Sequence, residues 1–112
     1  MKNLRNTVRL IGRLGDDPKV NKFENGKQVV TFRIATDESY KNKDGEKVEE
    51  TQWHNLEVWG GLSTVAEKYL KKGMEIAIEG RLVHDNYEKD GETRYFSKVA
   101  VNDLLMLGKK EN

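Results

Sequence analysis

The chain has 112 residues, a net charge of +1, two histidines and no cysteine. The length suits one domain spanning residues 1–112, and the composition excludes a disulfide framework, a thiolate metal site and a histidine metal cluster. No segment has the pattern of a signal peptide or a membrane span, and a domain this close to neutral needs segregated charges to hold nucleic acid.

The first third of the chain predicts short strands separated by turns. Residues 6–14 alternate between apolar and polar side chains, as a half-buried strand does. Ile11 interrupts the polar side of this strand, and it is either an ordinary exposed side chain or a subunit contact. Residues 19–23 can continue the sheet, and Asn25-Gly26 favours a tight hairpin because both residues tolerate positive φ. Residues 28–36 form the next predicted strand.

A long polar segment follows at residues 37–50. Its six acids and three lysines give a net charge of −3, and Asp44-Gly45 lies at its middle. This composition predicts either an extended hairpin or a mobile loop. Tyr40 is the only aromatic residue of the segment. Taken alone, a tyrosine in such a place is more often a lid over the sheet edge than a binding residue.

Residues 51–60 predict a strand with an unusual pattern. Because successive side chains of a strand point to opposite faces, Leu56 and Val58 face a core while Trp53 and Trp59 lie on the polar side. Large aromatic side chains on the polar side of a strand suggest a surface that contacts something flat and partly apolar. Two alternatives stay open at this point: the two faces are assigned the wrong way round, or a partner subunit covers the tryptophans.

Residues 62–72 have apolar side chains at helical spacing, and this is the only helix that the sequence predicts. Ser63 is a candidate N-cap. Lys71 and Lys72 suit the negative end of the helix dipole, and Gly73 is placed to terminate the helix.

The last third of the chain predicts two more strands. Residues 74–83 form the first of them, and residues 93–107 form the second. Between them, residues 85–92 predict a polar hairpin that turns at Asp90-Gly91 and contains Tyr87.

Five strands with one helix between the third and the fourth is the order of an OB-fold, an all-β, five-stranded Greek-key barrel, here with long hairpin loops. OB-folds bind oligonucleotides or oligosaccharides across their second and third strands, which is where the tryptophans lie. Such barrels hold single strands by stacking bases on aromatic side chains and by contacting the backbone with positive side chains. RNA and oligosaccharides therefore remain alternative ligands.

An enzyme such as a nuclease is the other class of function to weigh. Nucleases need carboxylates that converge on metal ions. The neighbouring acids Asp16-Asp17 and Glu49-Glu50 diverge within each pair, and the sequence has no Gly-rich phosphate-binding motif. We therefore expect no catalytic residues, no metal and no cofactor.

Six motifs of the chain occur in a recognisable order and spacing. They are N-T-V-R-L-I-G-R-L-G-D-D-P at 6–18, N-G at 25–26, F-R-I-A-T at 32–36, T-Q-W-H at 51–54, A-E-K-Y-L-K-K-G at 66–73 and I-E-G at 78–80. With these motifs, the sequence resembles the bacterial single-stranded DNA-binding protein family over about residues 4–108. The resemblance implies non-sequence-specific binding of single-stranded DNA in replication, recombination and repair, by a homotetramer. It also implies a cytoplasmic, nucleoid-associated protein.

The resemblance also implies which side chains stack on bases. Those aromatic residues are Trp53, Trp59, Tyr40 and Tyr87. His54 falls near subunit contacts in the family, so we interpret it as structural. Because the total charge is nearly zero, phosphate contacts must come from local cations. The candidates are Arg9, Arg13, Arg33, Lys71 and Lys72.

The resemblance leaves two points open. Typical members continue into a long linker and an acidic tail that recruits replication proteins, whereas this sequence stops at Asn112. It is either a shortened form or a naturally short member, so recruitment through a tail is in doubt. A dimeric relative without a tail, the primosomal replication protein N type, is the alternative, although the T-x-W-H and Asp-Asp-Pro motifs favour the main family. We expect a closed symmetric oligomer, a tetramer of two dimers, because the polar hairpins leave a modest core.

Overall fold

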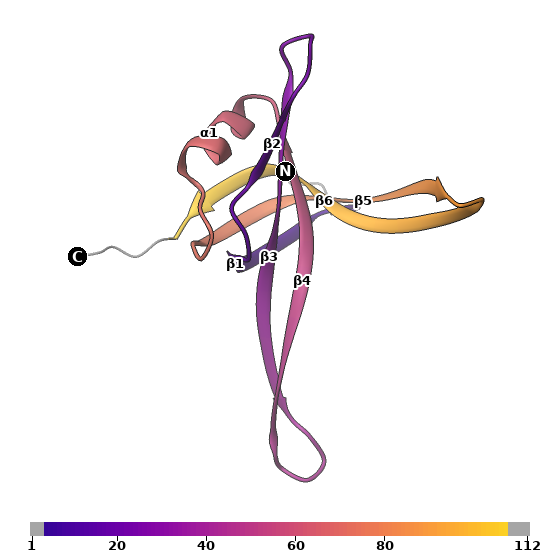
Figure 1. Cartoon of the computed structure of the whole chain (residues 1–112). Coiled ribbons are helices and arrows are strands. Elements are labelled where there is room, and N and C mark those ends of the chain that lie inside the picture. The colour runs from indigo at the N-terminus through magenta and orange to yellow at the C-terminus, as the bar shows by residue number, and fades with distance from the viewer. Residues whose placement is uncertain (1–3, 108–112) are drawn as a thin grey trace.

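The structure is a computed structural model that describes residues 4–107 (Figure 1). The elements within these residues are β1 (Val8–Leu14), β2 (Lys19–Lys22), β3 (Gln28–Lys41), β4 (Lys47–Trp59), α1 (Gly61–Tyr69), β5 (Glu75–Lys89) and β6 (Glu92–Met106).

The strands form one sheet that closes into a barrel. Its order is β1-β5-β6-β4-β3-β2, and β1 also pairs with β3 at Arg13 and Leu14. The pairing of β4 with β6 is parallel, and the other pairings are antiparallel. The barrel strands are therefore β1, β3, β4, β5 and β6, with the short β2 added at the edge of β3. The predicted OB-fold, with its helix between the third and fourth barrel strands, is confirmed.

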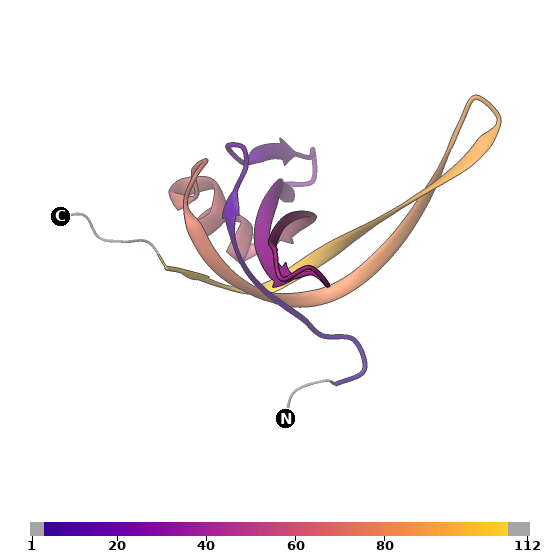
Figure 2. The same ribbon diagram turned by 90° about the horizontal axis from the view of Figure 1, so that it is seen from below.

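Alternating side chains of the barrel strands fill the core. These buried residues are Leu14, Val30, Phe32, Ile34, Leu56, Val58, Ile76, Ile78, Val99 and Val101. The helix α1 adds Ala66, and Leu70 follows directly after it. Burial of this apolar surface is the main force that holds the barrel together. Figure 2 shows the curved β5–β6 ribbon running along the barrel and continuing beyond it.

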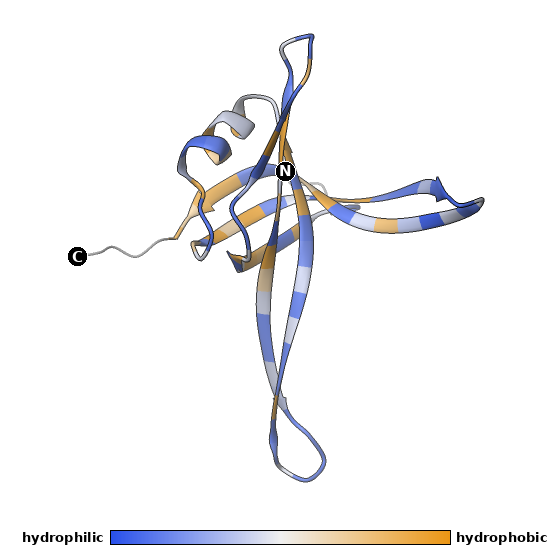
Figure 3. Ribbon diagram, viewed as in Figure 1, coloured by the Kyte–Doolittle hydropathy of each residue, from blue (hydrophilic) through white to orange (hydrophobic). Residues whose placement is uncertain are grey.

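Two long hairpins project from the barrel in different directions (Figure 1). We call residues 36–52 the β3–β4 arm and residues 83–98 the β5–β6 arm. Pairing continues to Lys41 opposite Lys47 in the first arm and to Lys89 opposite Glu92 in the second. Figure 3 shows that both arms are mostly hydrophilic, whereas apolar residues recur along the barrel strands.

The predicted polar segments are thus strands with short turns. Residues 37–50 adopt the extended hairpin of the two alternatives, because cross-strand pairing satisfies their backbone groups whatever the side chains are. At the tip of the β5–β6 arm, Asp90 and Gly91 have φ values of 55° and 81°, as a two-residue hairpin turn requires. At the other tip, the Asn42 Oδ1 atom accepts hydrogen bonds from the backbone N–H groups of Asp44 and Glu46.

Two predictions about the helix are wrong. α1 ends at Tyr69 instead of Lys72, because Leu70 turns into an extended conformation that buries its side chain in the core. Lys71 and Lys72 therefore lie after the helix. The N-cap is Gly60, without a side-chain cap, and the buried Ser63 hydroxyl donates a hydrogen bond to the Gly60 carbonyl oxygen.

An irregularity in β6 was not predicted. Gly80 of β5 pairs with Val101 while Glu79 pairs with Asp103, so Asn102 is an extra residue in β6. Such a bulge reverses which alternate residues face inward. Val99 and Val101 are buried before the bulge, and the half-buried Leu104 packs against the core after it.

Candidate nucleic-acid interface

Both tryptophans of β4 lie on the outside of the barrel, as predicted. Trp53 is 50% exposed and Trp59 is 46% exposed, whereas Leu56 and Val58 are buried between them. The alternative of an inverted assignment is therefore wrong. Large aromatic faces on the outside of a strand are available to stack on flat ligands.

Trp53 is contacted by residues of β3 and of the turn that follows β1. The Arg33 guanidinium carbon lies 4.7 Å from the centre of the Trp53 ring, a cation–π contact. Arg33 also pairs with Asp16, at 3.2 Å from Nη2 to Oδ2. A side chain at Gly15 would collide with the Trp53 ring, so this glycine makes room for the indole. Arg33 and Gly15 thus cover part of the Trp53 ring, Asp16 holds Arg33 in place, and half of the Trp53 surface stays exposed.

Trp59 forms a second aromatic group with Phe23. The two rings are stacked, with centroids 5.9 Å apart and planes 10° from parallel. Phe23 is 48% exposed and lies just after β2, next to the Asn25-Gly26 turn. The sequence analysis missed Phe23 as a site residue, because nothing local pairs the end of β2 with the end of β4.

A groove of about 380 Å³ runs over the outer sides of β3, β4 and β6. We call it the β3–β4–β6 groove. Its lining includes Asp16, Lys19, Arg33, Asn55, Phe96 and Lys98. Arg33 therefore connects Trp53 to the groove, and Phe96 connects the groove to the β5–β6 arm.

The β5–β6 arm carries its own aromatic pair. Tyr87 and Phe96 meet edge to face, with ring centroids 6.1 Å apart. Tyr87 was predicted as a site residue, whereas Phe96 was missed. Cross-strand register could have revealed it: Phe96 pairs with Asp85, two residues from Tyr87 on the same face of the ribbon.

Lys98, another groove residue that the sequence analysis missed, lies at the base of the same arm. Its Nζ atom is 2.6 Å from Asp85 Oδ2 and 2.9 Å from Glu57 Oε1. The hydrogen bond to Asp85 and, to a smaller degree, the contacts with Glu57 raise the pKa of Lys98, while partial burial acts in the opposite direction.

Tyr40 is separate from these groups. It lies near the tip of the β3–β4 arm, opposite Val48, and is half exposed. The ladder of this arm is continuous from Val29 to Lys41, so strand alternation places Tyr40 and Trp53 on opposite faces of the ribbon. At the base of the arm, His54 Nε2 lies 3.0 Å from Thr36 Oγ1, which agrees with a structural role for His54.

The predicted cations do not gather in one place. Only Arg33 lines the β3–β4–β6 groove. The Arg13 guanidinium donates a hydrogen bond to the Gly73 carbonyl, and the backbone N–H of Lys72 donates one to Asp17. Lys71 is exposed beside Lys72.

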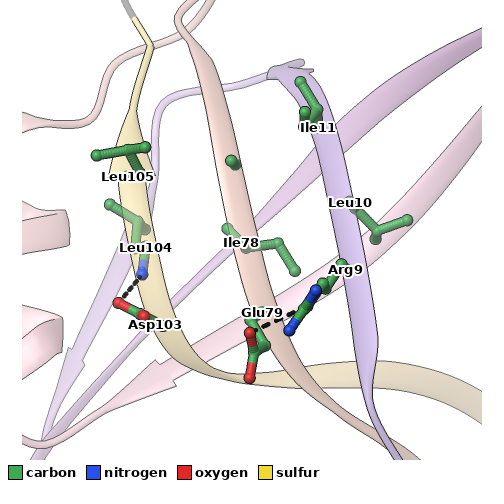
Figure 4. A pocket seen from close by; sticks show the side chains of 9 residues that line it. Arg9, Leu10, Ile11, Ile78, Glu79, Asp103, Leu104 and Leu105 are labelled. Atoms are coloured by element: carbon green, nitrogen blue, oxygen red, sulfur yellow. Dashed lines mark hydrogen bonds and ion pairs between the residues drawn. The ribbon is translucent and has the colours of Figure 1, made fainter. Parts of the chain in front are cut away.

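Arg9 lies on the outward side of β1, β5 and β6, in a second hollow of the surface (Figure 4). Its Nε atom pairs with Glu79 Oε1 at 3.1 Å. Ile11 pairs with Ala77 in the sheet, and Ala77 pairs with Leu105, so these three outward residues form an apolar stripe across the three strands. We call it the Ile11–Leu105 stripe.

Other classes of site are not visible in residues 4–107. No three His, Cys, Asp or Glu side chains are grouped there so as to bind a metal ion. Among the same residues, no helix is long and apolar enough to cross a membrane.

Comparison with known proteins gives one consistent result. Residues 5–107 match the Single-strand binding protein family. Single-stranded DNA-binding protein 1 of Chlorobaculum tepidum is 39% identical over 109 residues, which cover 96% of this chain and 67% of that protein. The single-stranded DNA-binding protein of Neisseria meningitidis serogroup A is 42% identical over 104 residues, covering 92% of this chain and 60% of that protein.

The fold gives the same result. A solved structure of the Plasmodium falciparum SSB complex with ssDNA superposes with a TM-score of 0.88 at 25% identity, covering 96% of this chain and 99% of that one. The chain thus spans 67% and 60% of the two bacterial relatives and 99% of the structurally similar chain. With a family match over nearly all described residues, the chain belongs to the single-strand binding protein family.

Proposed function

We propose that this chain binds single-stranded DNA without sequence specificity and coats it during replication, recombination and repair. One observation carries the proposal: the half-exposed Trp53 ring with the Arg33 guanidinium against it, at the edge of the β3–β4–β6 groove. An exposed indole offers a stacking face for any base, and an adjacent guanidinium attracts phosphate. Belonging to a family of DNA-binding proteins, the chain is not an enzyme.

The chemistry of the site supports binding without sequence preference. Trp53, Trp59, Phe23 and Tyr87 present ring faces or edges, and every base has a face that can stack on them. The β3–β4–β6 groove has three cations and three acids in its lining, so its own charges cancel. We therefore expect base stacking to contribute more to the affinity for DNA than local phosphate contacts do. Arg33 is the first candidate for these contacts, with Arg9, Arg13, Lys71 and Lys72 as further candidates.

We also propose a tetramer of two dimers. The Ile11–Leu105 stripe supports it, because Ile11 is 59% exposed and Leu105 is 63% exposed on one face. The edge of β1 that does not pair with β5 supports the tetramer too. Within residues 4–107, this edge pairs only with β3, at Arg13 and Leu14. An unpaired strand edge beside an apolar stripe suits pairing with a second copy of β1 about a two-fold axis.

Titration with oligo-dT tests the binding proposal. Stacking on Trp53 and Trp59 should quench tryptophan fluorescence, and affinity should fall as salt rises because phosphate contact releases counterions. RNA and an oligosaccharide of similar length serve as competitors. Tighter binding of either competitor, or no quenching by oligo-dT at low salt, would contradict the proposal.

Light scattering tests the assembly. A tetramer weighs four times 12.9 kDa, roughly 52 kDa. A dimer would instead favour the primosomal relative, and a stable monomer that binds DNA tightly would refute the assembly proposal. A single domain over residues 1–112 and a cytoplasmic, nucleoid-associated location are further parts of the proposal.

A further inference from the structure

The cluster of Lys98, Glu57 and Asp85 is the least exposed set of ion pairs among the described residues. The Lys98 and Glu57 side chains are 20% and 15% exposed, and Asp85 is 41% exposed. One ammonium group lies within hydrogen-bonding distance of two carboxylates that come from different strands. Lys98 belongs to β6, Glu57 to β4 and Asp85 to β5.

The position of Lys98 in the fold is informative. β6 pairs with β4 only over three residues, Val99 to Val101. Lys98 is therefore the first residue of β6 beyond this pairing, at the point where the β5–β6 arm leaves the barrel. Glu57 stays with the barrel and Asp85 goes with the arm, so the two ion pairs of Lys98 connect barrel and arm at their junction.

The aromatic pair of the arm lies immediately beyond this junction. Phe96 is two residues from Lys98 on the same face of β6, and the Lys98 Nζ atom is 5.9 Å from the Phe96 ring centre. Phe96 in turn contacts Tyr87. Phe96 and Lys98 line the β3–β4–β6 groove together with Asp16 and Arg33. The direction of the arm thus sets the distance between its aromatic pair and the Trp53–Arg33 side of the groove.

Two observations argue against Lys98 as a phosphate contact. Its ammonium group already has two carboxylate partners, at 2.6 and 2.9 Å. The cluster of one lysine and two acids carries a net charge of −1, which repels a phosphate. A two-stranded ribbon is weakly stable alone, so a contact at its base is well placed to fix its direction.

We propose that Lys98 is a positioning residue: by joining Asp85 of the arm to Glu57 of the barrel, it holds the Phe96–Tyr87 pair against the groove so that this pair takes part in stacking on single-stranded DNA. The proposal rests on the proposed function for its effect on binding. Its structural part, the fixed direction of the arm, does not depend on that function.

Binding of oligo-dT by variants tests the functional part. Lys98→Met keeps the length of the side chain and removes its charge, and Lys89→Met makes the same change near the tip of the same arm as a control. We expect Lys98→Met to weaken binding about fivefold and Lys89→Met to change it less than twofold. In a Tyr87→Ala background, the effect of Lys98→Met should shrink to less than twofold, since Lys98 acts through the aromatic pair.

Removal of the two acids separates positioning from direct phosphate contact. The double variant Glu57→Gln with Asp85→Asn takes away both carboxylate partners and leaves the charge of Lys98 in place. Positioning predicts that this variant binds oligo-dT about as weakly as Lys98→Met. Binding as tight as in the parent protein or tighter, together with a Lys98→Met effect that persists in the Tyr87→Ala background, would overturn the proposal.

A distance measurement tests the structural part without DNA. Because the chain has no cysteine, spin labels can be attached at two introduced cysteines, Glu88→Cys near the arm tip and Thr64→Cys on α1. Dilution of labelled chains into unlabelled protein keeps the measured distance within one subunit. We expect a narrow distance distribution in the parent protein and a broader one in Lys98→Met, with Lys89→Met unchanged. An unchanged distribution in Lys98→Met would overturn the proposal. Failure of the parent protein to bind oligo-dT would instead refute the proposed function.

Discussion

The two outward faces of the barrel expose large side chains to a similar degree but with different chemistry. On the face of β3 and β4, Trp53 and Trp59 are 50% and 46% exposed, and a guanidinium lies against one of them. On the face of β1, β5 and β6, Ile11 and Leu105 are 59% and 63% exposed. Aromatic rings with cations suit bases and phosphates, whereas aliphatic side chains can only be covered by other apolar surface. The exposed fraction of a side chain therefore does not show what a face binds, whereas the chemical type of the exposed side chain does.

The aliphatic face should give the largest effect. Ile11→Glu or Leu105→Glu places a charge in the Ile11–Leu105 stripe, and we expect the proposed tetramer to dissociate. Binding to a long oligonucleotide should then weaken by about 100-fold, because separate barrels no longer share one strand at high effective concentration. Binding to an oligonucleotide that covers a single barrel should change little. Light scattering and titration measure both effects.

Tyr69→Glu on α1 is the control for this change, since Tyr69 is also half exposed. If Ile11→Glu leaves the mass of the oligomer unchanged, the face of β1, β5 and β6 is not a subunit contact, and the difference between the two faces is refuted.

The aromatic face should give the next largest effect. Trp53→Ala and Trp59→Ala should each weaken binding to single-stranded DNA by about 1–3 kcal/mol while the barrel remains folded. Neither ring contributes to the buried core, so circular dichroism and the mass should match the parent protein. Wild-type binding by both variants, or unfolding of both, would show that the tryptophans are not a stacking surface.

A matched pair of arginines compares the charges of the two faces. Arg33 and Arg9 each pair with one acid, Asp16 and Glu79, but they lie on different faces. Arg33→Ala should reduce the slope of log affinity against log salt by about 0.7, the value for one phosphate contact with a single strand. We expect a smaller change for Arg9→Ala. A larger change for Arg9→Ala would place the path of the DNA on the second face.

The two arms allow a finer comparison. Tyr87 contacts Phe96 beside the groove, whereas Tyr40 lies on the opposite ribbon face from Trp53. We expect Tyr87→Ala to weaken binding by about 1 kcal/mol, the low end for stacking of one base, and Tyr40→Ala to have less effect. The reverse order in a titration with oligo-dT would indicate that the strand follows the β3–β4 arm.

The smallest effect concerns the stability of the fold at alkaline pH. The contacts with Asp85 and Glu57 raise the pKa of Lys98 in the folded chain. A raised pKa means that the charged lysine stabilises the fold fully below its unfolded pKa of about 10.4, and that this contribution is lost as the pH rises through the higher folded pKa. Between pH 6 and pH 9 this contribution is constant. We expect the difference in melting temperature between Lys98→Met and Lys89→Met to shrink from pH 8 to pH 11, and a difference that grows would contradict this assignment.

Local patterns in the sequence determined the strands, the turns and the direction of the tryptophans. Alternation over residues 51–60 was enough to place Trp53 and Trp59 outside and Leu56 inside, because a strand separates its two faces by geometry alone. Asp90-Gly91 determined a hairpin turn, because these two residues tolerate positive φ. The order of the elements determined the barrel.

Only the tertiary structure decided which side chains meet. Arg33, Asp16 and Gly15 gather around Trp53, Phe23 stacks on Trp59, and Lys98 joins two distant acids. These contacts depend on register and on barrel closure, which are properties of paired strands and not of any one segment. The helix end and the β6 bulge were missed for the same reason: burial of Leu70 and of Leu104 against the assembled core outweighs local preference.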